Sequence, residues 1–98
     1  MKTGRIVLIT GAAGGMGSEF VARFLANEDT VLATDLPDPL SKLGQKQSNS
    51  HLRTFAADLS SEADCAKLAE FAKTAGRVDV LINCAGYFPM TVRIYVGR

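Results

Sequence analysis

Residues 6–17 read IVLITGAAGGMG, and this stretch decides the fold. Its first five residues form a continuous run of β-branched and aliphatic side chains, which is typical of a strand buried on both faces. Glycines cluster at positions 11, 14, 15 and 17, and apolar side chains then recur with the period of a helix. The stretch therefore predicts a buried strand that turns through glycines directly into an amphipathic helix.

Strand and helix patterns alternate along the remainder of the chain. Further strands are predicted at residues 30–34, 52–57 and 78–83, a short helix at residues 39–43, and longer helices that begin near Met16 and Ser61. Connections too long for hairpins favour parallel strands, and right-handed crossovers place helices on both faces of the sheet. The predicted fold class is α/β, a doubly wound parallel sheet in a single domain.

The second of the longer helices has recognisable ends. Ser61, followed three residues later by Asp64, resembles a capping box with Asp in place of Glu or Gln, and Gly76 stands where a helix stop belongs. A stripe of period 3.6 predicts the buried face of this helix: Cys65, Leu68, Ala69, Ala72 and Ala75. We expect both cysteines, Cys65 and Cys84, to be small buried residues.

Composition and charge exclude several classes of function. Eleven basic and ten acidic side chains among 98 residues leave a formal charge of +1, so neither nucleic acid nor an anionic membrane is an expected partner. The longest uncharged run, residues 80–92, is shorter than the ~20 residues of a membrane-spanning helix. Two cysteines without Cys-x-x-Cys spacing predict neither a disulfide scaffold nor a metal site. We therefore expect a reduced, cytoplasmic, soluble protein.

The glycine turn predicts a phosphate site. A helix N-terminus presents unpaired N–H groups and a partial positive charge, and glycines let a pyrophosphate approach the backbone. The P-loop pattern is absent, because position 16 is Met and no lysine follows. The glycines fit Thr-Gly-x-x-x-Gly-x-Gly through Gly11, Gly15 and Gly17, but also Gly-x-x-Gly-x-x-Gly through Gly11, Gly14 and Gly17. The turn alone leaves two families open.

Two downstream motifs decide between these families. The third predicted strand is followed by Asp58-Leu59, and the fourth ends in Asn83-Cys84-Ala85-Gly86. Together with the glycine turn, they resemble the short-chain dehydrogenase/reductase family, whose fourth strand ends in Asn-Asn-Ala-Gly; Cys84 replaces the second Asn. The resemblance covers residues 5 to about 88. Through residues 35–37 and 77–86 the nearest likeness is to type-2 3-hydroxyacyl-CoA dehydrogenases.

This resemblance implies the architecture more closely. The sheet is expected to be a truncated Rossmann-type sheet with strand order 3-2-1-4, and residues 1–90 to form an NAD(P)-binding half-domain. Residues 91–98 are expected to be a tail, because they lack the polar helix opening that usually follows in the family. One hypothesis is a truncated or frame-shifted product with a non-native tail, and another is a deliberately shortened or incomplete chain.

Asp35 carries its own physical argument for the cofactor. It lies at the carboxyl end of the second predicted strand, 20 residues beyond Gly15, where an acid accepts hydrogen bonds from the adenosine ribose. A carboxylate there repels the extra phosphate of NADP, and positions 12 and 13 are alanines that supply no compensating cation. NAD is therefore favoured over NADP. The alternative is that Asp35 merely caps a turn before Pro37.

The resemblance also implies the remaining contacts with the cofactor. Asp58 and Leu59 would line the adenine pocket, and Asn83, Ala85 and Gly86 would flank the adenosine ribose. The alternatives are that Asp58 is a polar residue before a helix and that Asn83 satisfies backbone groups of a neighbouring strand. The full set of candidate cofactor-binding residues is Gly11, Gly15, Met16, Gly17, Asp35, Leu36, Asp58, Leu59, Asn83, Ala85 and Gly86.

No catalytic residue can be assigned. The family uses a Tyr-x-x-x-Lys pair, a Ser and a further Asn downstream of the fourth strand. Tyr95 would need a lysine at position 99, and Tyr87 is followed four residues later by Thr91. The resemblance implies an NAD-dependent oxidoreductase for alcohols and carbonyls, of which this chain supplies only the cofactor-binding half. The alternative is a non-catalytic nucleotide-binding fragment or an inert truncation product.

The fourth predicted strand raises a question of stability. Without a following strand, its outer edge offers unpaired N–H and C=O groups. Either self-association covers this edge, or the alternating apolar residues Val92, Ile94 and Val96 pair with it locally. Self-association through the fourth-strand edge is accordingly one expected partner interaction, beside the dinucleotide.

Overall fold

The computed structural model describes residues 4–85 and 93–96. In chain order its elements are β1 (Ile6–Thr10), α1 (Gly15–Ala26), β2 (Thr30–Asp35), α2 (Pro37–Lys46), β3 (Leu52–Ala56), α3 (Glu62–Ala75), β4 (Val80–Asn83) and β5 (Arg93–Val96). Helix α2 is longer than the predicted residues 39–43, because Pro37 occupies the start of the helix, where its fixed φ and missing N–H do no harm.

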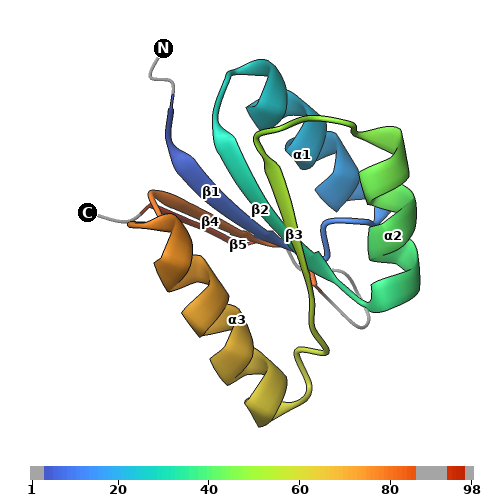
Figure 1. The fold of residues 1–98 in the computed structure, drawn as a ribbon, viewed down its shortest axis with the longest axis vertical. Helices are drawn as coiled ribbons and strands as arrows, with labels where there is room; N and C mark the ends of the chain where they lie inside the picture. The colour runs from blue at the N-terminus through green and yellow to red at the C-terminus, as the bar shows by residue number, and fades with distance from the viewer. Residues whose placement is uncertain (1–3, 86–92, 97–98) are drawn as a thin grey trace.

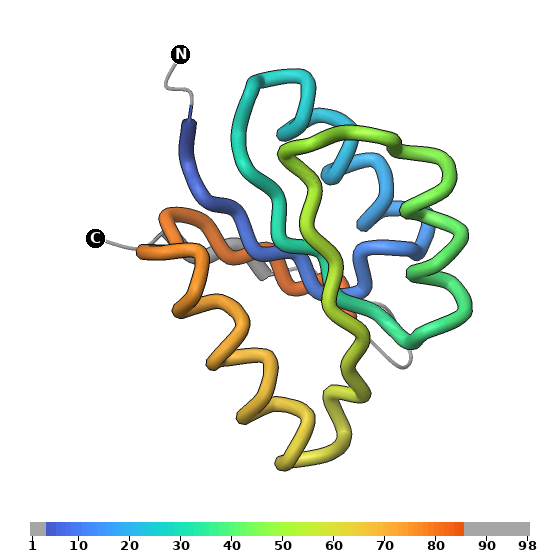
Figure 2. Tube along the Cα trace, in the orientation of Figure 1, coloured from blue at the N-terminus to red at the C-terminus, as the bar shows by residue number. Residues whose placement is uncertain are grey.

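The strands form one sheet in the order β3-β2-β1-β4-β5. The first four are parallel, with Val7 of β1 opposite Val31 of β2 and Val80 of β4. This confirms the predicted order 3-2-1-4. Helices α1 and α2 lie on one face of the sheet and α3 lies on the other, as expected for a doubly wound fold (Figure 1; Figure 2).

Strand β5 is the main difference from the predicted sheet. It runs antiparallel to β4, with Val96 opposite Val80 and Arg93 opposite Asn83. An antiparallel neighbour needs only a return loop, without a helical crossover. Of the two alternatives for the edge of the fourth strand, the structure shows the local one, because residues 93–96 pair with β4 and the edge is not exposed. Self-association through that edge would first have to displace β5. Val92 lies outside the described residues.

The core lies between the sheet and helices α1 and α2. Val7, Ile9, Val21 and Val31 are completely buried there, and Cys84 is buried as predicted. The continuous apolar runs of the strands account for this core, because each parallel strand contributes side chains to both faces.

Helix α3 is less deeply buried than its sequence stripe predicts. Leu68 and Ala72 are buried, and the Phe71 ring stacks on Phe55 with centroids 4.9 Å apart. The prediction that Cys65 is buried is wrong: the residue is exposed, and its Sγ donates to the carbonyl of Leu59 at 3.4 Å. The N-terminal end of α3 points away from the sheet (Figure 1), and of the predicted stripe Ala69 is exposed as well, while Ala75 is partly buried.

A buried carboxylate fixes the start of β1 against the turn between α1 and β2. The Asp29 side chain has no exposed surface and accepts hydrogen bonds from the Arg5 backbone N–H at 2.9 Å and from the Arg5 guanidinium at 3.2 Å. Burial raises the pKa of Asp29, but hydrogen bonds from Arg5 and Asn27 outweigh it, and the net pKa is lowered. The carboxylate is thus held in its charged form.

We expect the unfolding free energy of Asp29→Asn to depend less on pH in the acid range than that of the unchanged chain. Because the pKa of Asp29 is lower in the folded chain than in the unfolded chain, its contribution is complete above the unfolded value and is lost as pH falls through the folded one. The variant should lose about 1–3 kcal/mol of unfolding free energy near pH 7 and less at low pH. Urea unfolding between pH 3 and pH 7 measures both quantities.

The control for this experiment is Glu70→Gln. Glu70 is an exposed carboxylate, 3.7 Å from the ammonium of Lys73. Exposed pairs contribute ~0–1 kcal/mol, so this variant should follow the unchanged chain. An Asp29→Asn protein with the same pH profile as the Glu70→Gln protein would contradict the role given to Asp29.

Candidate functional site

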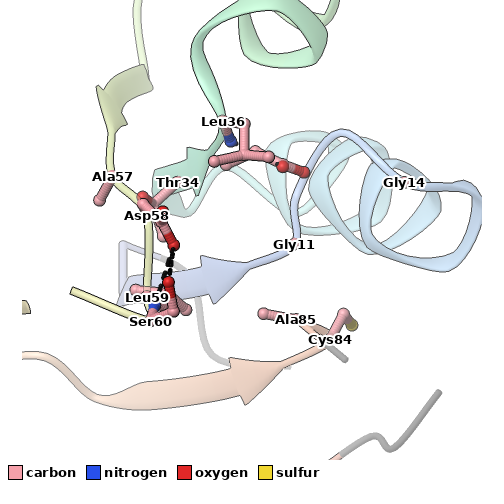
Figure 3. A pocket seen from close by; sticks show the side chains of 11 residues that line it. Gly11, Gly14, Thr34, Leu36, Ala57, Asp58, Leu59, Ser60, Cys84 and Ala85 are labelled. Carbon is pink, nitrogen blue, oxygen red and sulfur yellow. Dashed lines mark hydrogen bonds between the residues drawn. The ribbon is translucent and has the colours of Figure 1, made fainter. Parts of the chain in front are cut away.

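A cleft of about 460 Å³ opens where β1, β2 and β4 and the segment after β3 end together. Strand order reverses between β1 and β4, and the carboxyl ends of parallel strands at such a point form the usual ligand crevice of open α/β sheets. The residues that line the cleft are Gly11, Gly14, Thr34, Asp35, Leu36, Ala57, Asp58, Leu59, Ser60, Cys84 and Ala85 (Figure 3).

The cleft brings together six of the candidate residues predicted from the sequence: Gly11, Asp35, Leu36, Asp58, Leu59 and Ala85. Gly15, Met16 and Gly17 do not line the cleft; they form the first turn of α1, directly after residues 11–14, the glycine loop. Asn83 ends β4 but does not line the cleft. Gly86 lies outside the described residues.

Two glycines allow the close approach of the glycine loop to its neighbours. Gly11 has a φ of +63°, and a Cβ there would lie 2.7 Å from the backbone N of Ala85. A Cβ on Gly17 would collide with the carbonyl oxygen of Gly11. Glycine at these two positions therefore lets β1, the end of β4 and α1 pack together.

Gly15 has a different role. It is exposed, and a Cβ built on it would meet no atom within 4 Å. Helix α1 has no side-chain cap on Gly14 and no acidic residue in its first turn, so the first N–H groups of the helix are left for another acceptor. The open space beside Gly15 thus adjoins a positive helix end, which suits a phosphate.

Two large apolar side chains are exposed at this end of the sheet. Among the described residues with large hydrophobic side chains, Met16 and Leu36 are exposed, at 47% and 50%. One belongs to the first turn of α1 and the other directly follows β2. Exposed apolar side chains beside a concave site are typical of a surface that a bound ligand covers.

The Asp35 carboxylate links β2 to the glycine loop. One oxygen accepts a hydrogen bond from the backbone N–H of Ala13 at 2.9 Å, and the other accepts one from Leu36 at 2.7 Å. The contact with Leu36 fits the turn-capping alternative, whereas the contact with Ala13 joins two segments that both border the cleft. Each carboxylate oxygen retains a further lone pair. The carboxylate is therefore oriented while it can still accept hydroxyl groups.

Asp58 has both a cleft position and a local structural role. Its Oδ1 accepts hydrogen bonds from the backbone N–H of Ser60 at 2.9 Å and from the Ser60 hydroxyl at 2.6 Å (Figure 3). These bonds lower the pKa of Asp58. Its backbone N–H donates to Asp64, whose own N–H donates to Ser61 as the predicted cap. The carboxylate is thus charged and fixed just before α3.

Asn83 ties the ends of β1 and β4 together. Its side-chain oxygen accepts a hydrogen bond from the Thr10 hydroxyl, and the same hydroxyl accepts one from the Ala85 N–H at 3.3 Å. The bond joins Asn83 to the neighbouring strand through a side-chain hydroxyl, not through the backbone groups that the alternative interpretation named. Through Thr10, it also sets the position of Ala85 at the edge of the cleft.

Sequence reasoning missed five cleft residues: Gly14, Thr34, Ala57, Ser60 and Cys84. Thr34 and Ala57 directly precede Asp35 and Asp58, so their position at strand ends was an available signal. Burial raises the pKa of the Cys84 thiol, which keeps it protonated and unsuited to act as a nucleophile.

The described residues give two further findings. No three His, Cys, Asp or Glu side chains in this part of the chain come together as metal ligands would. Over the same residues, no helix is both long and apolar enough to cross a membrane.

The sequence matches known proteins along most of its length. The family model of the short chain dehydrogenases matches residues 5–94. An uncharacterized short-chain type dehydrogenase/reductase, y4vI of Sinorhizobium fredii, is 43% identical over 91% of this chain and 16% of its own length. Bovine 3-hydroxyacyl-CoA dehydrogenase type-2 is 34% identical over 85% of this chain and 32% of its own length.

Solved structures of similar proteins share the fold. A Brucella melitensis 3-ketoacyl-(acyl-carrier-protein) reductase complexed with NADH has a TM-score of 0.73 and 31% identity, covering 81% of this chain and 33% of that one. The Pseudomonas aeruginosa RhlG/NADP complex has a TM-score of 0.72 and 30% identity, covering 89% and 36%. The chain spans a third or less of the curated relatives described above. The glycine turn, the strand order and the family match over residues 5–94 together show that the chain belongs to the short-chain dehydrogenase/reductase family.

Proposed function

We propose that the chain binds NAD in the cleft and is the cofactor-binding half of an oxidoreductase that transfers a hydride between an alcohol and a carbonyl. The observation that carries the proposal is a pair of features, one lining the cleft and the other directly beyond Gly14 at its border. A fixed carboxylate, Asp35, stands at the end of β2, and the open space at Gly15 adjoins the uncapped N-terminus of α1.

The pyrophosphate and the adenosine end of the dinucleotide each have a matching group in this site. The pyrophosphate would lie against the first turn of α1, where Gly15 leaves room and the N–H groups are unpaired. The adenosine ribose hydroxyls would donate to Asp35. The adenine would pack between Leu36 and Leu59, which line the same cleft. Ala85, and by resemblance Gly86, would flank the ribose.

The preference for NAD over NADP rests on charge. The Ala13 N–H holds the Asp35 carboxylate at the ribose edge, and a phosphate on that ribose would meet it directly. Positions 12 and 13 of the glycine loop carry no cation to offset the repulsion. Solved relatives hold either NADH or NADP, so the family alone does not choose, whereas Asp35 supports NAD.

The residues of this chain would bind and orient the cofactor, and the cofactor would supply the hydride chemistry. The acid–base step of the family needs a Tyr-x-x-x-Lys pair, which these 98 residues do not contain. We accordingly propose that residues 1–90 form a cofactor-binding half-domain without turnover of its own. A cytoplasmic location fits the two free thiols, one of them on an exposed residue.

The direct test combines a binding titration with an activity assay. Calorimetry should detect NAD binding by the purified chain, whereas NADH formation at 340 nm from a panel of secondary alcohols should stay at the level of the blank. Turnover would contradict the half-domain reading. Failure to bind NAD would favour the inert truncation product instead.

Asp35→Ala should weaken NAD binding about tenfold or more, because the lost hydrogen bonds to a charged acceptor contribute ~1.5–3 kcal/mol. NADP binding should fall less, since the repulsion of its extra phosphate disappears as well. The NAD/NADP preference should therefore narrow. Calorimetric titration of both dinucleotides measures these changes.

The matched control is Asp38→Ala, which removes an exposed carboxylate three residues away in the first turn of α2. It changes the net charge by the same amount, but Asp38 does not line the cleft. Equal NAD affinity in the Asp35→Ala and Asp38→Ala proteins would remove Asp35 from the binding site.

A further inference from the structure

The Thr34 hydroxyl has an unmet hydrogen bond. The Thr34 side chain is completely buried, and its Oγ1 is the buried side-chain polar atom that has no hydrogen-bond partner within the described part of the chain. A buried hydroxyl without a partner destabilises the folded state, since it loses water and gains nothing in exchange. Such a group in a native fold needs an explanation.

Neighbouring polar groups do not supply the missing partner. In the register of the sheet, Thr10 of β1 lies opposite both Thr34 of β2 and Asn83 of β4, so the three form a polar row across the strands. Thr10 donates to Asn83 and accepts from Ala85. The hydroxyl proton of Thr10 is therefore already donated within the protein. The Thr34 hydroxyl is the one in this row that has no partner.

Thr34 lies where its hydroxyl is close to the proposed binding site. The residue lines the cleft directly before Asp35, and Ala57 and Asp58 of the segment after β3 line the same cleft (Figure 3). Its backbone carbonyl accepts the N–H of Ala12 at 3.1 Å, which anchors the glycine loop. The backbone of Thr34 thus shapes the site, while its side chain lies at the end of the cleft assigned to adenosine.

We propose that Thr34 is a binding residue for the base of the dinucleotide, and this rests on the function proposed above. A hydroxyl both donates and accepts, and the edge of adenine offers ring nitrogens and an amino group that match either role. The contact forms directly, when the base occupies the cleft. The hydroxyl that is unpaired in the free protein is thereby paired in the complex.

Thr34→Val and Thr34→Ser separate this role from a purely structural one. Valine keeps the shape of threonine and removes the hydroxyl, and serine keeps the hydroxyl. Calorimetry should show NAD binding about five- to tenfold weaker in Thr34→Val and nearly unchanged in Thr34→Ser. The same loss is expected for ADP-ribose, which retains the adenosine end. The melting temperature of Thr34→Val should be equal to or higher than that of the unchanged chain.

The control is Thr30→Val, a substitution on the same strand and the same face but at the opposite end of β2. It should bind NAD as the unchanged chain does. A Thr34→Val protein with raised stability and full NAD affinity would overturn the role of Thr34 and leave the proposed function standing. A lowered melting temperature would overturn the premise that the hydroxyl is unpaired. Absence of NAD binding by the unchanged chain would overturn both proposals.

Discussion

Gly15→Val is expected to fold like the unchanged chain and to bind NAD at least about 100-fold more weakly. The new side chain meets no protein atom within 4 Å of its Cβ, so the packing of α1 is not disturbed. It occupies the space beside the unpaired N–H groups of α1, where the pyrophosphate is expected to lie. A 100-fold loss corresponds to ~2.7 kcal/mol of binding free energy.

Circular dichroism and calorimetry together check this result. Gly44→Val is the matched control, because Gly44 is an exposed helical glycine of α2 whose Cβ would likewise meet nothing within 4 Å. It introduces the same side chain into a helix, where valine is more favourable than glycine, but it lies away from the cleft. If a folded Gly15→Val protein bound NAD as tightly as the Gly44→Val protein, the phosphate site would lie elsewhere.

Gly17→Val should instead strongly destabilise the fold. Its Cβ would collide with the carbonyl oxygen of Gly11 and lie 2.9 Å from the Cα of Ala12. Both neighbours are backbone atoms of the glycine loop, which cannot rotate away as a side chain can. Overpacking of this kind costs about 3 kcal/mol or more, a large part of the ~5–15 kcal/mol that holds a small domain together.

Thermal unfolding followed by circular dichroism measures this effect. A loss of ~3 kcal/mol lowers the midpoint of a chain of this size by about 12 °C or more. Gly15→Val provides the comparison, since it introduces the same side chain two positions earlier in the same helix. A Gly17→Val midpoint equal to that of Gly15→Val would show that α1 and the glycine loop can move apart without cost.

The two substitutions also show what sequence reasoning could resolve. The glycine turn predicts a phosphate site, because a helix N-terminus that is reached through glycines offers unpaired N–H groups and room for an anion. The sequence pattern does not show which glycine has which role. That Gly17 is confined by Gly11, while Gly15 faces open space, depends on how closely the loop approaches α1 in three dimensions.

The strands and two of the candidate residues at their ends were predictable for different reasons. Apolar runs define buried parallel strands, and Asp35 was identified because it closes such a run. Asp58 was given by the resemblance to the family. Thr34 was not identified, because a threonine inside a β-branched strand reads as ordinary strand propensity, and its unpaired hydroxyl becomes visible only once Thr10 and Asn83 are placed beside it.

Helix α3 and strand β5 mark where local patterns stop being sufficient. The stripe that contains Cys65 has the period of a helix, but its burial depends on how closely the helix follows the sheet. The first turns of α3 lie away from the sheet. The alternation of residues 92–96 suggested a strand. Whether it would pair with β4 or leave that edge to another chain depended on competition between partners, which a single sequence does not rank.

The register of the sheet has a consequence for the order in which the chain folds. Each residue of β4 is 10 to 16 positions in sequence from its partner in β5. By contrast, Val7 of β1 and its partner Val80 of β4 are 73 positions apart. Short loops close at lower entropic cost, so the hairpin can form early and the central pairing late. The cleft exists only after that distant pairing. A dinucleotide bridging β2 and the end of β4 would therefore act chiefly by slowing unfolding, with little effect on the rate of folding.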